Sequence, residues 1–211
     1  MTGLNELDVV HAGRAVAERV GARALTMRML AAELGVSTMA AYRHVVSKTE
    51  LLALIADDIL SGVTVPSGGC GEWDTRLEIL ESSAFSQISL VPDLWDLLPP
   101  GRILPAELRL NGVVAGILLS AGFEPLPAAW AQEAIFGYVF GQVRLRMRVV
   151  SAGLTDDRDG HRGRTDRAEM QAHFLYGLRI MLAGLRKELE GGGPASCGVH
   201  QRSALPSHPT R

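Results

Sequence analysis

Positively charged and hydroxyl-bearing side chains are concentrated in one stretch of the sequence, which begins at Arg23. From Arg23 to Lys48 there are four cations against one anion, Glu33, a local balance of +3 in a chain whose net charge is −2. The polar and amphipathic side chains of this stretch include Thr26, Arg28, Ser37, Thr38, Tyr42, Arg43, His44 and Lys48. Such groups bind phosphate oxygens and base edges, so the stretch has the chemistry of a DNA-contacting surface.

Catalytic and metal-binding chemistry has no comparable cluster in the sequence. None of the six histidines forms a pair at metal-ligand spacing, and no glycine-rich phosphate loop follows a strand pattern. Asp156, Asp157 and Asp159 resemble the start of a calcium loop, but the terminal glutamate is missing. Cys70 and Cys197 have no metal-ligand partner at a useful spacing. We therefore expect a protein without enzymatic activity, metal ion or cofactor.

Helix-capping residues divide the basic stretch into short helices. Thr26 is a good N-cap, because its hydroxyl can accept from the free amides of the first turn. Gly35 is expected to end that helix in the left-handed conformation that glycine adopts without strain. Ser37 can then cap a second helix over residues 38–45. Ala31, Gly35 and Ala41 have the spacing of a helix-turn-helix, although an ordinary helical hairpin with a solvated face remains the alternative.

The run LTMRMLAAELGVSTMAAYRHVVSKTELL resembles the DNA-binding domain of the tetracycline-repressor (TetR) family of bacterial transcriptional regulators. The matching residues are Thr26, Arg28, Leu30, Ala31, Leu34, Gly35, Val36, Tyr42, His44, Val45, Lys48, Leu51 and Leu52. The resemblance implies a three-helix head whose second motif helix lies in the major groove. Met39 and Ala40, within the second motif helix, offer little hydrogen-bonding capacity. Apolar contact with a thymine methyl group is therefore expected there. Arg28 and Lys48 are expected at phosphates, with Thr38 and Tyr42 near the bases.

The remainder of the chain predicts an all-α fold. We expect a helix-turn-helix head over 1–47, a linking helix within 48–65, and a ligand-binding and dimerisation domain over 72–190. Residues 66–71, rich in proline and glycine, mark the boundary between them. A mobile loop is expected over 151–166, and a disordered tail over 191–211. The expected helices outside the basic stretch are 5–20, 48–63, 72–90, a short one near 94–98, 105–121, 128–150 and 167–190.

The last two long helices have the features of a dimer interface. Phe174, Leu178, Met181 and Leu185 recur at spacings of four, three and four, which is typical of a coiled-coil-like seam. The preceding helix offers Gly137 and Gly141 for close backbone approach. Both stripes could instead face the subunit's own core, but TetR-like proteins dimerise through these helices. We therefore expect a homodimer through the helices near 128–150 and 167–190.

A regulator of this type also needs an effector pocket in its C-terminal body. The candidate ligand-binding residues are Phe85, Trp95, Leu98, Arg102, Asn111, Trp130, Phe136, Tyr138 and Gln142. An aromatic residue at helical spacing is more often a core residue than a ligand contact, which is the alternative for each. Alignment with the tetracycline repressor through the loop near Arg102 places Leu98, Gly101 and Leu145 where that repressor uses metal-tetracycline contacts. We therefore expect a metal-free, mostly apolar or aromatic effector.

These features together predict a cytoplasmic, ligand-responsive repressor that binds a palindromic operator as a homodimer. No apolar run approaches the roughly 20 residues of a membrane span, so no membrane partner is expected. The alternative function is a dimeric helical ligand-binding or adaptor protein of the same fold without operator binding. Tyr42, His44 and Lys48 favour the DNA-binding function.

Overall fold

The computed structural model describes residues 4–151 and 167–191, and the side chains of 4–145 and 168–191. This part of the chain contains α-helices and one turn of 3-10 helix, and no strand, which confirms the expected all-α fold. The elements are α1 (Glu6–Val20), α2 (Met27–Leu34), α3 (Thr38–Ala41), α4 (Lys48–Ser61), α5 (Trp73–Ile88), η1 (Pro92–Leu94), α6 (Pro105–Ala121), α7 (Pro125–Ser151) and α8 (Arg167–Glu190).

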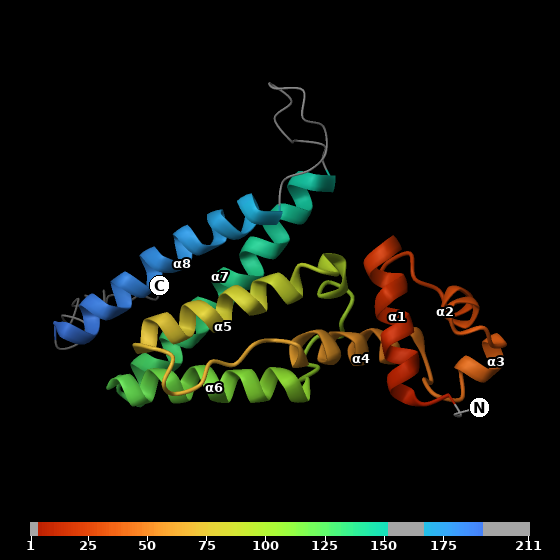
Figure 1. Ribbon diagram of the computed structural model, residues 1–211, viewed down its shortest axis with the longest axis horizontal. Coiled ribbons are helices and arrows are strands. Elements are labelled where there is room, and N and C mark those ends of the chain that lie inside the picture. Colours follow the sequence, from red (N-terminus) through yellow and green to blue (C-terminus); the bar gives the residue numbers. More distant parts are fainter. Residues whose placement is uncertain (1–3, 152–166, 192–211) are drawn as a thin grey trace, which may run out of the picture.

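The first three helices form a compact head at one end of the molecule (Figure 1). Asn5 caps α1 by accepting from the amide of Asp8, whose carboxylate accepts in turn from the amide of Asn5. Val9, Val16 and Leu30 are fully buried in the head, because α1 packs against α2 and α4. The head therefore has its own apolar centre beneath the helix-turn-helix.

Helix α4 joins the head to the body and contacts both. On the head side, Gly13 of α1 lets the two backbones approach closely, since a Cβ there would lie 3.0 Å from a methyl group of Leu51 and 3.1 Å from one of Ile55. On the body side, α4 packs against α5 and α6. The buried residues of head and body form one continuous hydrophobic cluster, so α4 is a shared structural element rather than a free linker.

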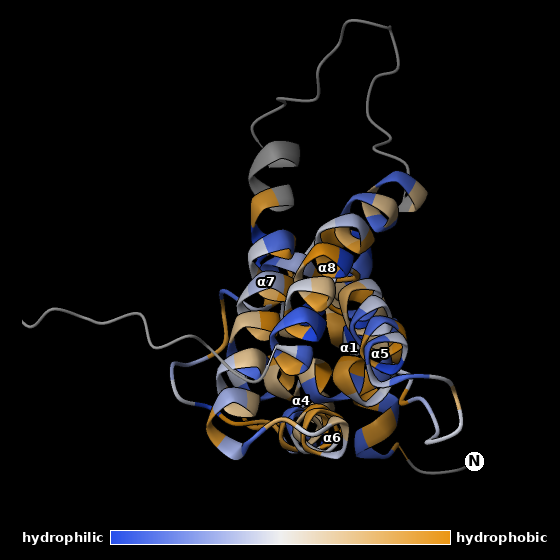
Figure 2. Ribbon diagram, turned by 90° about the vertical axis from the view of Figure 1, so that its left-hand side faces the viewer, coloured by the Kyte–Doolittle hydropathy of each residue, from blue (hydrophilic) through white to orange (hydrophobic). Residues whose placement is uncertain are grey.

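The body consists of α5 to α8 together with η1. Helix α5 is central, because it contacts α4, α6, α7 and α8 (Figure 1). Phe85 of α5 stacks on Phe174 of α8 with ring centroids 4.2 Å apart, and both rings are almost completely buried. Figure 2 shows apolar positions gathered where these helices face each other and polar positions on the outward faces.

Several helix boundaries match the sequence expectation to within two residues, and three elements differ by more. Helices α6 and α8 begin and end where expected, since Pro105 fits a first turn and Gly122 adopts a left-handed conformation with φ of +106°. The second motif helix ends at Ala41 instead of position 45, because the amides of Arg43 and His44 bond to carbonyls three residues back. The helix expected near 94–98 is instead the 3-10 turn η1, and α7 begins at Pro125 rather than 128.

Part of the seam expected on α8 faces the interior of this subunit. Phe174 and Leu178 are fully buried here, so the interpretation of these two residues as partner-facing is wrong. Gly177 lies beside them because Tyr138 occupies the adjoining space: its hydroxyl donates to the carbonyl of Phe174 at 2.8 Å. The loop and tail expected over 151–166 and 191–211 lie almost wholly outside the described residues.

Among the described residues, no helix combines the length and the apolarity needed to cross a membrane.

Candidate nucleic-acid interface and ligand cavity

The helix-turn-helix is built by the local signals that the sequence contains. The hydroxyl of Thr26 accepts from the amide of Met29 at 3.2 Å and so caps α2. Gly35 ends α2 with φ of +66°, in the left-handed region that favours glycine. Ser37 caps α3 by accepting from the amide of Ala40 at 3.2 Å. These two hydrogen bonds and the left-handed conformation of Gly35 confirm the predicted helix-turn-helix.

Helix α3 presents an unusually open outer face. Ala41 is completely buried and anchors the helix against the head. On the opposite side the side chain of Met39 is 77% exposed, and Tyr42 is 45% exposed. Val46, just beyond the helix, is 82% exposed. Large apolar groups this exposed on a small head indicate a surface that another molecule covers.

The charges of the head leave cations available at this surface. Glu33, the anion of the basic stretch, is paired with Arg19 at 2.7 Å. Arg28 and Arg43 are exposed, and neither pairs with a carboxylate within the described part of the chain. Lys48 donates to the backbone carbonyl of Arg23 at 2.9 Å, which ties the start of α4 to the loop between α1 and α2. An ammonium group has three donors, so two remain for a phosphate.

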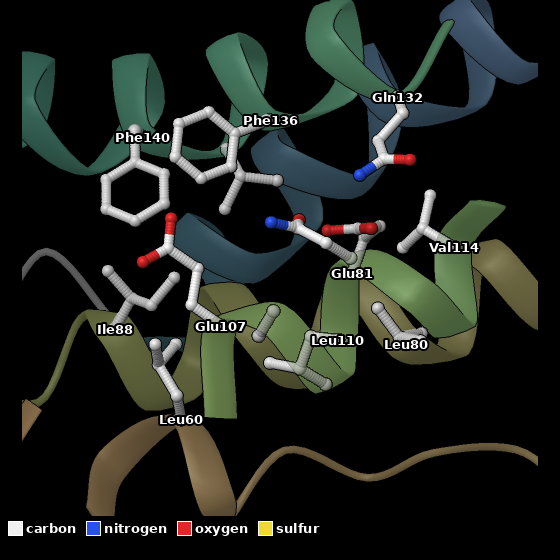
Figure 3. Close-up of a pocket in the computed structure, with 13 residues that line it drawn as sticks. Leu60, Leu80, Glu81, Ile88, Glu107, Leu110, Val114, Gln132, Phe136 and Phe140 are labelled. Atoms are coloured by element: carbon white, nitrogen blue, oxygen red, sulfur yellow. The ribbon is translucent and has the colours of Figure 1, made fainter. Parts of the chain in front are cut away.

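The body contains a mostly apolar cavity of about 60 Å³ between α4, α5, α6 and α7. Figure 3 shows Phe136 and Phe140 on one side, with the carboxylates of Glu81 and Glu107 and the amide of Gln132 directed toward the space between the helices. The cavity is partly open to solvent, since Phe136 is 42% exposed. The residues that line it are Leu60, Leu80, Glu81, Ala84, Ile88, Glu107, Leu110, Asn111, Val114, Gln132, Phe136, Val139 and Phe140.

Glu81 is the most unusual of the lining residues. It is only 6% exposed, and no hydrogen bond or ion pair joins its carboxylate to any residue that the structure describes. Burial raises the pKa of Glu81 from its ordinary value of 4.5 to about 7, because removal from water disfavours the charged form. A buried acid without a partner therefore faces a mostly apolar cavity.

Two of the residues proposed from the sequence line this cavity, Asn111 and Phe136. The other seven lie outside it: Phe85, Trp95, Leu98, Arg102, Trp130, Tyr138 and Gln142. Phe85 and Tyr138 are core residues that pack on Phe174. Arg102 and Trp130 are exposed, Leu98 packs at the edge of the core, and the side-chain oxygen of Gln142 is buried with no partner in the described part of the chain.

The sequence does contain a signal for Glu81. Position 81 lies four residues after Leu77, three before Ala84 and seven before Ile88, so helical geometry places it on the buried face of α5. An acid on the apolar stripe of a helix is a candidate functional residue. Glu107, Gln132 and Phe140 gave no comparable signal, since they meet Glu81 only through the packing of three helices.

Two structural connections lead from the cavity to the head. Leu60 lines the cavity near one end of α4, and Lys48 binds the head loop at the other end. The second connection begins next to the cavity, at Trp95. The indole N–H of Trp95 donates to the carbonyl of Ile88 at 2.9 Å, and its ring packs edge-on against Phe140.

Two residues earlier, Asp93 of η1 completes this second connection. Its carboxylate accepts from the backbone amides of Ala22 at 3.0 Å and Arg23 at 2.8 Å. The turn η1 therefore lies between Trp95, which contacts the cavity-lining Phe140, and the loop between α1 and α2.

The structure thus defines a helix-turn-helix protein in which a three-helix head is attached to an all-α body that contains a partly open cavity. Residues 9–55 match the family model described as bacterial regulatory proteins, tetR family. The head of the chain therefore has the DNA-binding domain of the TetR family of bacterial regulatory proteins.

The relatives are similar over the head and much of the body. The HTH-type transcriptional repressor DrrR1 of Streptomyces coeruleorubidus is 32% identical over 154 residues, which is 70% of this chain and 57% of that relative. The chain thus spans a little over half of DrrR1. An HTH-type transcriptional regulator of Saccharopolyspora erythraea is 27% identical over 205 residues, 86% of this chain and 84% of the relative.

Among solved structures, a TetR variant from Acinetobacter baumannii AYE in complex with minocycline superimposes with a TM-score of 0.68. It is 26% identical, and the match covers 89% of this chain and 99% of that one. The similarity therefore extends beyond the head to the body that contains the cavity.

Proposed function

We propose that this protein is a ligand-responsive transcriptional repressor that binds a palindromic operator as a homodimer and is released by a small molecule. One observation supports this most strongly: a head with an exposed reading surface is joined, through α4 and η1, to a cavity that contains an unpaired acid. The repressor name of the relative from S. coeruleorubidus agrees with this direction of regulation.

In the proposed complex, α3 enters the major groove with Met39 and Tyr42 foremost. Met39 and Ala40 contact thymine methyl groups, and Thr38 hydrogen-bonds a base edge. Phosphates are bound by Arg28, Arg43 and Lys48. The remaining proposed contacts with the backbone come from Thr26, Ser37 and His44.

The proposed dimer interface uses the outward faces of α7 and α8. Tyr176 and Ile180 of α8 are 70% and 59% exposed, one turn apart. On α7, a stripe of exposed residues at helical spacing has small residues at its centre, where a second helix can approach closely. The stripe consists of Trp130, Ala134, Gly137, Gly141 and Leu145.

Such a dimer explains how a ligand changes DNA binding. Two heads read two half-sites about one helical turn apart, so operator affinity depends on their separation. A ligand in the cavity displaces Leu60 of α4 and the Ile88–Trp95 contact, and Asp93 moves the head loop with them. Coupling of this kind typically amounts to about 1–3 kcal/mol between effector and operator.

The experiment that tests the proposal is selection of bound duplexes from a random pool by the purified full chain, followed by sequencing. We expect a palindrome with half-sites one turn apart, bound by two copies of the chain. Absence of enrichment, with a folded dimer shown by sedimentation, would instead support the alternative of a ligand-binding or adaptor protein that does not bind an operator.

A further inference from the structure

The charge of the cavity lining restricts the kind of molecule that it can hold. Of the thirteen lining residues, Glu81 and Glu107 are the ionisable ones, and no lysine, arginine or histidine is among them. Glu107 accepts from the amide of Leu104 at 3.4 Å through one carboxylate oxygen, which leaves its other oxygen free. An anionic ligand would meet two acids and no cation, so the cavity disfavours it.

The burial of Glu81 has no explanation within the subunit. A buried polar group is normally hydrogen-bonded, and a buried carboxylate is normally paired. The acid instead lies on the apolar face of α5, where an alanine or a leucine would pack without this penalty. A ligand that supplies the missing donor would remove the cost of burial, and a positively charged donor would do so best.

The apolar part of the cavity indicates what should accompany the positive charge. The rings of Phe136 and Phe140 lie 4.5 Å apart between centroids and are tilted by 35°. Aromatic faces attract both flat rings and organic cations. A bare metal ion does not fit this lining, since it would need several oxygen ligands, and no cluster of three or more His, Cys, Asp or Glu suited to a metal occurs among the described residues.

We propose that the effector is an organic cation, a protonated amine on an apolar ring-containing scaffold, whose ammonium group pairs with Glu81. This inference rests on the proposed function and specifies its ligand class. Gln132 and Asn111 supply hydrogen-bonding groups next to the ion pair, and Glu107 adds a second negative charge on α6. The preference for a cation over a neutral molecule of the same shape is the property that distinguishes this proposal.

The test is equilibrium dialysis of the full chain, at about pH 8, against three single-ring probes of similar shape, chosen because the cavity is small: benzylamine, benzyl alcohol and benzoic acid. At this pH the probes are cationic, neutral and anionic. We expect the amine to bind at least about tenfold more tightly than the alcohol, and the acid more weakly than both. Ala84→Phe, which fills the cavity, should abolish binding of the amine and the alcohol alike.

Glu81→Gln should remove the preference for the amine while the alcohol binds as before. The matched control is Glu133→Gln, which removes one negative charge from an exposed position of α7 outside the cavity. If Glu81→Gln does not fold, the wild-type chain still gives a result. At about pH 6, binding of the amine should release protons into the buffer, because pairing keeps Glu81 ionised, and binding of the alcohol should not.

The possible failures are distinguishable. Equal binding of amine and alcohol, both blocked by Ala84→Phe, would overturn the cation inference and leave the cavity as the effector site. Binding of none of the three probes would also overturn the inference. Operator selection by the same preparation would then show whether DNA binding, the other half of the proposed function, still holds.

Discussion

Replacing Glu81 by glutamine should change how the stability of the protein depends on pH. The folded protein holds a proton on Glu81 up to about pH 7, whereas the unfolded chain releases it near 4.5. Between these values the folded state binds more protons than the unfolded state, so stability falls as pH rises through this window. Glutamine has a similar shape and no charge, so the folded Glu81→Gln protein does not lose stability in this way as pH rises.

The magnitude follows from the two pKa values. A shift from 4.5 to about 7 corresponds to roughly 3 kcal/mol at pH above 7, at 1.36 kcal/mol per unit. A small part of this destabilisation of the wild-type protein is already present at pH 5. The free energy of unfolding of Glu81→Gln, relative to that of wild type, should therefore rise by about 2.5 kcal/mol between about pH 5 and pH 8. The other charged groups near this face are Glu107 on α6 and the Glu78–Arg179 pair between α5 and α8, and all are common to both proteins.

The assay is urea unfolding of the two proteins at matched concentration, followed by circular dichroism at several pH values. The concentrations are matched so that dissociation of a dimer contributes equally to both unfolding curves. A constant difference between the two proteins from pH 5 to pH 8 would refute the assignment of Glu81 as a buried, unpaired acid. Glu133→Gln, at an exposed site, should show no such pH-dependent difference.

Four further outcomes are expected. Arg43→Ala should weaken binding to all duplexes alike and reduce the slope of log affinity against log salt by about one, as measured by fluorescence anisotropy; a loss confined to one sequence would contradict a phosphate contact. Asp93→Ala should lower the free energy of unfolding by about 1–2 kcal/mol, since the backbone amides of two residues lose their acceptor. The control Asp96→Ala, which breaks an exposed ion pair, should change this free energy by less than about 0.5 kcal/mol. Ile180→Arg should convert the dimer to monomer in sedimentation velocity without unfolding the subunit, and an unchanged dimer would exclude this face. Gly177→Ala should destabilise by about 1–3 kcal/mol, because the added Cβ would clash with the hydroxyl of Tyr138, and a melting temperature equal to that of wild type would show that Tyr138 can move aside.

Local signals made much of the fold predictable. Thr26, Gly35, Ser37 and Pro105 act within one helical turn of their own positions, so the sequence alone shows where those helices begin or end. One of the differences depends on tertiary packing. The 3-10 turn η1 forms where Asp93 binds the head loop, and no pattern near Pro92 contains that information.

The ligand site was less predictable for the same physical reason. A cavity lies between elements that are far apart in the chain, and its lining depends on how those elements pack. Phe85 is of a residue type that often contacts ligands, but its ring stacks on Phe174, 89 positions further along the chain. Glutamate is usually a surface residue, yet the packing of α6 and α7 over α5 buries Glu81.

The exposed surface of α3 predicts which variants are informative for DNA binding. Lys48→Ala would remove both a proposed phosphate contact and a hydrogen bond that positions the head loop, so its effect would combine binding and folding. Met39 and Tyr42 are more suitable, because both are exposed and their truncation leaves the buried anchor Ala41 in place.

The most direct measurement is therefore the affinity of the selected duplex for wild type and for the double variant Met39→Ala with Tyr42→Ala, by fluorescence anisotropy at one fixed salt concentration. Leu108→Ala, at an exposed site on α6, serves as the control. We expect the double variant to bind at least about tenfold more weakly, which corresponds to about 1.4 kcal/mol, and the control to bind like wild type. Equal affinities for all three proteins would contradict the claim that α3 reads the operator.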